Sequence, residues 1–144
     1  MRKLVILMAV LTLALAGCGD DGDDTEASSG ETDTTVGSPV SLPAGTPFHG
    51  TADAKDGMEV ELDDFYFGPT VIEATPGQVF KVELFNEGAA PHTFTIDSLN
   101  VDEQLGPDER REITVTAPAA AGEVAFYCKF HRSSGSMQGV LLVA

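Results

Sequence analysis

The stretch YCKFHRSSGSMQG, residues 127–139, places one of the chain's two cysteines three positions before a histidine and shortly before a methionine. Cys128, His131 and Met137 together offer a thiolate, an imidazole and a thioether. A cysteine in an exported protein is normally paired in a disulfide, whereas one that serves chemistry stays unpaired. The role of Cys128 therefore depends on where the protein resides and on whether the other cysteine is its partner.

The first 17 residues have the features of an export signal. Arg2 and Lys3 form a basic start, residues 4–15 form an apolar run broken only by Thr12, and Ala16-Gly17 is a small-residue cleavage site. The apolar run is short for a membrane span, and small and acidic residues follow it directly. A retained transmembrane anchor is therefore the weaker alternative, and the sequence predicts a signal peptide over residues 1–17.

The motif LAGC, residues 15–18, resembles the lipobox of bacterial lipoproteins. The resemblance implies cleavage before Cys18 and lipid attachment to it. The protein would then be lipid-anchored to the cell membrane outside the cytoplasm, in the periplasm or on the outer face. The alternative is a plain secretory peptide, with Cys18 free or bonded to Cys128. If Cys18 is lipidated, Cys128 has no partner within the chain.

Composition divides the remaining chain into a linker and a domain. Residues 19–46 are rich in Asp, Glu, Gly, Ser and Thr and contain almost no bulky apolar side chain, so they cannot bury a core. We therefore expect residues 18–46 to be a lipidated cysteine followed by a disordered acidic tether. The remaining residues, 47–144, suit one domain with a core of modest size.

The chain is strongly acidic, with a formal net charge of −15. Residues 47–144 alone contain 16 Asp and Glu against 6 Lys and Arg. This charge excludes nucleic acid as a partner, because phosphate binding needs a basic surface. It favours cationic partners instead.

The pattern of residues 47–144 predicts an all-β fold. Short runs rich in β-branched and aromatic residues alternate with turn formers such as Gly68-Pro69 and Pro76-Gly77, and no helical periodicity of useful length is present. The expected strands are residues 58–67, 70–74, 78–86, 93–96, 111–116, 123–128 and 139–143. About seven short strands in one small domain favour a two-sheet antiparallel Greek-key sandwich, which carries function in the loops at one end.

Four side chains in the predicted loops form a candidate metal site. His92 follows the strand that should end near Asn86, and Cys128 closes a later strand, with His131 and Met137 in the loop after it. If both strands run to the same edge, these side chains converge. Zinc has little use for a thioether. Two imidazoles, a thiolate and a weak axial Met are instead the blue-copper arrangement, which predicts a copper ion that passes single electrons.

These loops resemble those of the cupredoxins, in particular the plastocyanin-like group. NEGAAPH, residues 86–92, is similar to the first ligand loop of that family. FYCKFH, residues 126–131, is similar to the second, and MQG, residues 137–139, to the entry to the last strand. The resemblance covers essentially all of residues 57–144. It implies the cupredoxin-like fold, one type 1 copper held by the four side chains named above, and electron exchange at the exposed edge of His131.

One departure from the family pattern concerns the axial ligand. Five residues separate His131 from Met137, where the plastocyanin pattern has four. A bulge within residues 132–136 would absorb the extra residue and keep Met137 in place. Gln138 is the alternative, because Gln also serves as a weak axial ligand.

The resemblance also implies supporting roles for residues beside the ligands. Thr93 stands where the family uses a hydrogen-bonding residue to tie the two ligand loops together. Phe130 and Pro91 should form an apolar rim around the second imidazole. Lys129 and Arg132 flank that rim and could orient a partner.

The function that these features favour is a membrane-tethered electron carrier and not an enzyme. Its partners would be a redox protein donor and a redox protein acceptor, and we expect it to be a monomer. The alternative is copper storage or delivery, with the same ligands binding Cu(I). An enzyme with Cys128 as nucleophile has the right residue types but lacks a recognisable oxyanion site. Neither His49 nor Met58 matches a ligand position: we expect His49 to be exposed without a role and Met58 to pack in the core.

Overall fold

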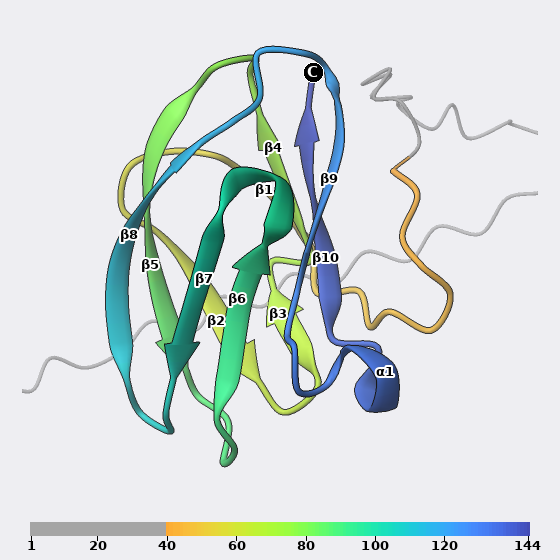
Figure 1. Ribbon diagram of the computed structural model, residues 1–144, viewed down its shortest axis with the longest axis vertical. Helices are drawn as coiled ribbons and strands as arrows, with labels where there is room; N and C mark the ends of the chain where they lie inside the picture. The colour runs from red at the N-terminus through yellow and green to blue at the C-terminus, as the bar shows by residue number, and fades with distance from the viewer. Residues whose placement is uncertain (1–39) are drawn as a thin grey trace, which may run out of the picture. The chain divides into compact units, whose positions relative to one another are not determined.

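The computed structural model describes residues 40–144 (Figure 1). The predicted signal peptide, Cys18 and most of the predicted tether lie outside the described residues. Within residues 40–144, no helix has the length and hydropathy that a membrane span requires.

Residues 40–144 contain ten strands and two very short helices. The strands are β1 (Thr51–Asp53), β2 (Met58–Asp63), β3 (Tyr66–Gly68), β4 (Val71–Ala74), β5 (Val79–Asn86), β6 (His92–Ile96), β7 (Val101–Leu105), β8 (Arg110–Thr116), β9 (Gly122–Tyr127) and β10 (Gln138–Val143). The helices are the 3-10 turn η1 (Asp97–Leu99) and the single turn α1 (Arg132–Gly135). One sheet has the order β1-β4-β10-β9-β6-β7, and the other has the order β3-β2-β5-β8. The predicted all-β, two-sheet sandwich is confirmed.

The predicted antiparallel pairing applies to most but not all strand pairs among residues 40–144. The pairs β1–β4, β4–β10 and β2–β5 are parallel, whereas the remaining pairs are antiparallel. The reason is that the chain crosses repeatedly between the sheets, after β1, β3, β4, β5, β7 and β8, so strands distant in sequence become neighbours. The consequence matters for function, because β2 and β5 now end at the same edge of the sandwich.

Several element boundaries differ from the sequence prediction. The expected strand over residues 58–67 is a hairpin, in which Asp64-Phe65 forms a turn between β2 and β3 and Phe65 has a φ of 75°. The strands β1 and β7 were not predicted, because each is short and carries exposed polar side chains. The helix α1 lies in the loop where a bulge was expected, and its four residues are too few to show a helical period.

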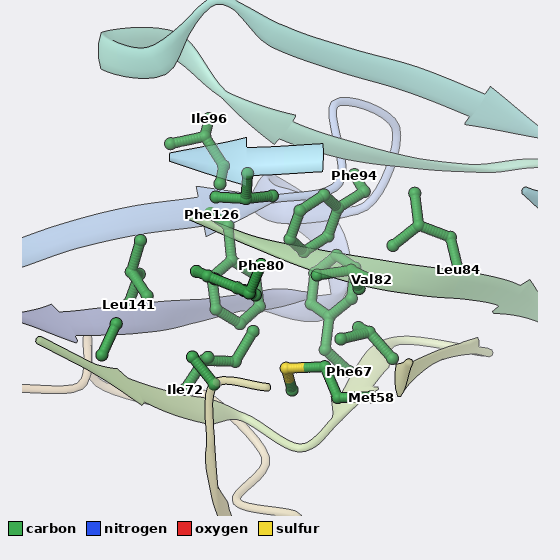
Figure 2. Close-up of a cluster of buried hydrophobic side chains, with 14 of the residues drawn as sticks. Met58, Phe67, Ile72, Phe80, Val82, Leu84, Phe94, Ile96, Phe126 and Leu141 are labelled. Carbon is green, nitrogen blue, oxygen red and sulfur yellow. The ribbon is translucent and has the colours of Figure 1, made fainter. Parts of the chain in front are cut away.

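The core lies between the two sheets and is built by the alternation that the sequence displays. Along β5, Phe80, Val82 and Leu84 point inward and are buried, while their neighbours are more exposed. Figure 2 shows these side chains meeting those of the facing sheet, among them Phe94 and Phe126. Met58 packs in the same cluster, as predicted.

Residues before β1 contact the sandwich within the range that the sequence assigned to the tether. The backbone N–H of Ser41 donates to the Glu123 carboxylate at 2.8 Å, and Thr46 N–H donates to the Pro43 carbonyl at 3.1 Å. The segment therefore contacts β9 through the hydrogen bond from Ser41.

Candidate metal centre

The ends of two antiparallel strands bring the predicted ligands together. His92 is the first residue of β6, and Cys128 directly follows the last residue of β9. Because these strands are antiparallel neighbours, with Thr95 opposite Tyr127, the start of β6 lies beside the end of β9. His131 precedes α1 and Met137 precedes β10, so both lie at the same end (Figure 1).

Three of the predicted donors lie within bonding range of a common point. The Cys128 Sγ atom is 3.8 Å from His92 Nδ1 and 3.5 Å from His131 Nδ1, and the two Nδ1 atoms are 3.1 Å apart. A first-row metal with bonds of about 2.0–2.3 Å at the centre of a triangle needs donors roughly 3.5–4.0 Å apart. The observed triangle is close to that size. Among residues 40–144, these three side chains form a group that could hold a metal ion.

The thiol of Cys128 is buried and unpaired, with no disulfide partner in the described part of the chain. Burial alone would raise the pKa of this thiol. Hydrogen bonds to the sulfur, among them those from the backbone N–H groups of Thr93, Phe130 and His131, outweigh burial and lower the pKa to about 6. The thiolate that a soft metal needs is therefore the favoured form near neutral pH.

The two imidazoles have different surroundings. His92 is completely buried, and its Nε2 atom lies 3.4 Å from Asp64 Oδ1, within reach of a hydrogen bond. His131 is partly exposed and has aromatic neighbours. The ring of Phe65 meets it edge-on with centroids 5.1 Å apart, and the ring of Phe130 lies 6.2 Å away.

The strand register places Met137 on the side of the thiolate. The backbone N–H of Cys128 donates to the Met137 carbonyl at 3.0 Å, one step beyond the pair formed by Tyr127 and Gln138. Directly opposed residues in an antiparallel pair point to the same face. Met137 therefore shares the face of Cys128, while Gln138 shares the face of Tyr127. Met137 is also fully buried.

Hydrogen bonds link the two ligand loops as predicted for Thr93. Its hydroxyl accepts from Lys129 N–H at 2.9 Å, and its own N–H donates to Cys128 Sγ at 3.4 Å. The sequence analysis missed Asn86, which is fully buried. The Asn86 side-chain amide donates to the Ala90 carbonyl at 2.9 Å and its oxygen accepts from Gly88 N–H at 2.9 Å. An Asn at a strand end, two residues before a Gly, was the available signal.

The predicted apolar rim beside His131 is present. A shallow hollow at this point is lined by Ala90, Pro91, Gln104, Phe130 and His131. Phe130 is 50% exposed, and the rim gains a second exposed ring in Phe65, which the sequence analysis did not assign to the site.

The two basic residues predicted to flank the rim are held by neighbours. Lys129 forms an ion pair with Asp102, and the Arg132 guanidinium lies 4.3 Å from the centroid of the Tyr127 ring. Because Asp102 offsets the charge of Lys129, the local positive charge is weaker than the sequence suggests. His49 is exposed as predicted, although its ring stacks on Tyr66 with centroids 3.6 Å apart.

A model of the cupredoxin-like domain family matches residues 5–143. A search of curated proteins finds no match to this chain.

Solved structures share the fold at low sequence identity. Auracyanin from the photosynthetic bacterium Roseiflexus castenholzii, reduced with dithionite, is 22% identical, with a TM-score of 0.54 over 63% of this chain and 98% of its own. Auracyanin A, a blue copper protein from Chloroflexus aurantiacus, is 19% identical, with a TM-score of 0.51 over 66% of this chain and 100% of its own. The metal binding domain of a Cu(I) exporting P-type ATPase from Streptococcus pneumoniae, in a structure with Cu(I), is 16% identical. Its TM-score is 0.53 over 68% of this chain and 99% of its own.

Proposed function

The chain belongs to the cupredoxin-like domain family, and we propose from this premise that it carries single electrons through a type 1 copper centre. The observation that carries the proposal is the triangle of His92, Cys128 and His131, whose donor atoms all lie within 4.8 Å of one another. Two imidazoles and one thiolate are the equatorial set of blue-copper sites. Auracyanin A, which shares the fold, is described as a blue copper protein.

The residues around the triangle suit the tasks that such a centre requires. His92 Nδ1, Cys128 Sγ and His131 Nδ1 would hold the metal, and Met137 would be the axial ligand because it shares the face of Cys128. The chemistry supplied at this site is the Cu(I)/Cu(II) couple, which exchanges one electron. Burial of His92 and Cys128 excludes water from the metal, whereas the partly exposed His131 offers a short path to a partner.

Copper loading of the full chain tests the proposal. With Cu(II) we expect an intense blue absorption and a narrow copper hyperfine splitting in the EPR spectrum, since both follow from a Cu–thiolate bond in a trigonal site. The variant Cys128→Ala should lose the colour and the redox signal while it keeps its fold, because the core lies between the sheets. A colourless Cu(II) complex of the parent chain would contradict electron transfer through a type 1 centre.

The axial ligand has its own test. Met137→Leu should keep the blue colour and shift the reduction potential upward, because a weak axial donor favours Cu(II). Gln138→Leu is the matched control, since Gln138 shares the face of Tyr127. A larger potential shift for the Gln138 variant would assign the axial position to that residue.

Copper delivery is the second candidate function. It is favoured by the fold shared with the metal binding domain of a Cu(I) exporter, whose structure contains Cu(I). In that case Cu(I) should pass from the protein to a competing chelator within seconds. An electron carrier should retain it, because its ligands are fixed before the metal binds.

We also propose that the carrier is anchored by lipid on Cys18 outside the cytoplasm, either in the periplasm or on the outer face of the membrane. The support is the motif LAGC at residues 15–18 and the apolar run before it. Mass spectrometry of membrane-extracted protein should find acyl chains on Cys18, and Cys18→Ala should release the protein from the membrane. The redox donor and acceptor would then be membrane or extracytoplasmic proteins, and the carrier itself would be monomeric and would transform no substrate.

A further inference from the structure

A turn outside the two ligand loops touches both imidazoles. Asp64 and Phe65 connect β2 to β3 at the end of the sandwich where β6 begins (Figure 1). Asp64 Oδ1 lies 3.4 Å from His92 Nε2, and the ring of Phe65 meets the ring of His131 edge-on. Two adjacent residues therefore contact the two histidines that belong to different loops.

The contact with Asp64 determines which nitrogen of His92 carries the proton. His92 Nδ1 faces the thiolate and the second imidazole, at 3.8 Å and 3.1 Å, so it must present a lone pair to bind a metal there. A neutral imidazole then carries its hydrogen on Nε2, and the carboxylate of Asp64 can only accept it. Carboxylates in this position orient ligand histidines and raise their basicity.

The surrounding chain is shaped to let Asp64 reach this point. A Cβ atom at Gly88 would lie 2.7 Å from His92 Nε2 and 2.8 Å from Asp64 Oδ1, so only glycine leaves room for the pair. The backbone N–H groups of Glu87 and Gly88 both donate to the Leu62 carbonyl, at 3.1 Å and 3.3 Å. These bonds attach the first ligand loop to the end of β2, directly before the turn.

The turn is also anchored from its other side. The Asp63 carboxylate accepts from Asp64 N–H at 2.6 Å and from the Tyr66 hydroxyl at 2.8 Å. These two hydrogen bonds lower the pKa of Asp63, the backbone bond being the larger cause. The turn is therefore held by an ionised side chain at neutral pH.

Phe65 adopts an uncommon backbone conformation to reach His131. Its φ of 75° lies in the left-handed region, which bulky side chains rarely occupy. Its ring packs against Gly135 of α1, where a Cβ atom would lie 2.5 Å from Phe65 Cδ1. A strained residue whose ring contacts a candidate ligand indicates that the contact is maintained for function.

We propose that the β2–β3 turn is a third loop of the metal centre, in which Asp64 fixes the Nε2–H tautomer of His92 and Phe65 holds the ring of His131. Both are positioning residues, since neither reaches the metal position. This inference rests on the proposed copper centre, but its main consequence, a fixed tautomer, is present before any metal binds.

Nitrogen-15 NMR of the metal-free full chain tests the role of Asp64. In the parent chain, the His92 ring should show the pattern of a protonated Nε2 and an unprotonated Nδ1. Asp64→Ala should give a mixture of tautomers, whereas Asp64→Asn should keep the parent tautomer, because the amide oxygen still accepts a hydrogen bond. Glu87→Ala is the matched control: it removes one exposed charge from the adjacent loop. An Asp64→Ala spectrum identical to that of the parent would overturn the proposal.

Metal affinity provides the second measurement. Competition titration with Zn²⁺ and with Cu(I) should show weaker binding to Asp64→Ala by about 10–100-fold, the usual effect of losing an outer partner of a ligand histidine. Asp64→Asn should recover most of the affinity, and Glu87→Ala should leave it unchanged. A loss below about 10-fold for Asp64→Ala would overturn its role as an outer partner of His92. An equal loss for Glu87→Ala would show that Asp64 acts only through its charge.

The role of Phe65 is tested by comparing the two exposed rings beside His131. Phe65→Ala should broaden the NMR signals of the His131 ring and weaken Zn²⁺ binding, because the edge-on contact is lost. Phe130→Ala removes the more distant ring of the rim, 6.2 Å from His131, and should change both measurements less. Equal effects of the two variants would remove Phe65 from the proposed loop.

These measurements separate the inference from the proposed function. If the parent chain fails to turn blue with Cu(II) while Asp64→Ala still loses the tautomer, the third loop exists but the metal is not type 1 copper. If the chain turns blue and the tautomer is unaffected by Asp64→Ala, the copper centre stands and the third loop does not.

Discussion

His92 and His131 each offer a ring nitrogen to the same candidate site, yet the surroundings of the two imidazoles differ. His92 begins a strand, is fully buried, and has Asp64 and Gly88 against its outer edge. His131 stands in a loop before one helical turn, is partly exposed, and has aromatic side chains around it. We refer to these two surroundings as the closed side and the open side of the site.

The closed side also rests on a specific part of the core. Phe67, Phe94 and Phe126 contact one another with ring centroids 5.1–5.9 Å apart (Figure 2). Phe94 lies two residues after His92, and Phe126 lies two residues before Cys128. The strands that carry these two ligands are thus fixed directly beneath the site, whereas the open side is a surface loop.

The difference suggests that the two sides of the proposed metal centre serve different tasks. A site that changes charge without moving its ligands needs rigid donors, which the closed side supplies. A site that exchanges electrons with another protein also needs one ligand near the surface, which the open side supplies.

Removal of one ring beneath the closed side should have the largest effect. Phe126→Ala should lower the free energy of unfolding by about 3–5 kcal/mol, because Phe126 is fully buried and a cavity would remain. Urea denaturation measures this loss. Val79→Ala is the control: Val79 is 61% exposed, so its loss should be within about 0.5 kcal/mol. A loss below about 1 kcal/mol for Phe126→Ala would mean that the core beneath the closed side collapses easily.

Deletion of each imidazole should distinguish the two sides most directly. His92→Gly and His131→Gly each remove one of three close donors, so metal affinity should fall by more than the roughly 100-fold cost of losing an outer partner. Added imidazole should restore binding to His131→Gly, because that position opens to solvent beside Ala90 and Phe130. It should not restore binding to His92→Gly, whose position is sealed. Equal rescue of both variants would show that the closed side opens readily in solution.

Two glycines offer a matched pair of smaller changes. Gly88→Ala should cost about 1–3 kcal/mol and weaken metal binding, since its new methyl group meets His92, Asp64 and the fixed Asp64 backbone. Gly135→Ala meets Phe65, whose ring is 48% exposed and can turn away, although its Cβ atom would stay 2.9 Å from the new methyl group. The higher helix propensity of Ala, worth about 1 kcal/mol, offsets part of that clash in α1. Thermal melts and Zn²⁺ titrations of both variants would compare them, and a larger loss for Gly135→Ala would reverse the expected order.

The sequence predicts those elements in which apolar residues alternate with others or in which the ligand types have a recognisable spacing. The strand β5 was predicted because its inward residues are apolar and alternate with others, and the ligand loops were predicted because Cys128 and His131 have a recognisable spacing. The strand β7 was missed because its sequence, VDEQL, carries two acids and one amide with only its last residue fully buried.

The residues of the third loop could not be predicted for a different reason. Asp64 is one acid in a chain with 23 Asp and Glu residues, so its residue type alone does not identify it as part of the site. Its contact with His92 exists only because β2 and β5 are parallel and end at one edge, and that pairing was not predicted. The role of Phe65 depends likewise on its left-handed φ, which is uncommon for an aromatic residue.

The smallest expected effect concerns the hydrogen bond that anchors the turn on the closed side. Tyr66→Phe removes the hydroxyl that donates to Asp63 at 2.8 Å and should destabilise the fold by about 0.5–1.5 kcal/mol. This bond lowers the pKa of Asp63 and, as the largest cause, raises the pKa of Tyr66 to about 12. A lowered carboxyl pKa stabilises the fold above its unfolded value of 3.8, and this stability is lost as the pH falls through the folded value. A raised phenol pKa stabilises the fold below 10.0, and this stability is lost as the pH rises toward 12.

Urea denaturation of both chains across this range should therefore show the greatest difference between about pH 4 and 10, with convergence on either side. A difference that is independent of pH would mean that the Tyr66 hydroxyl contributes to stability in some other way than through its bond to the ionised Asp63.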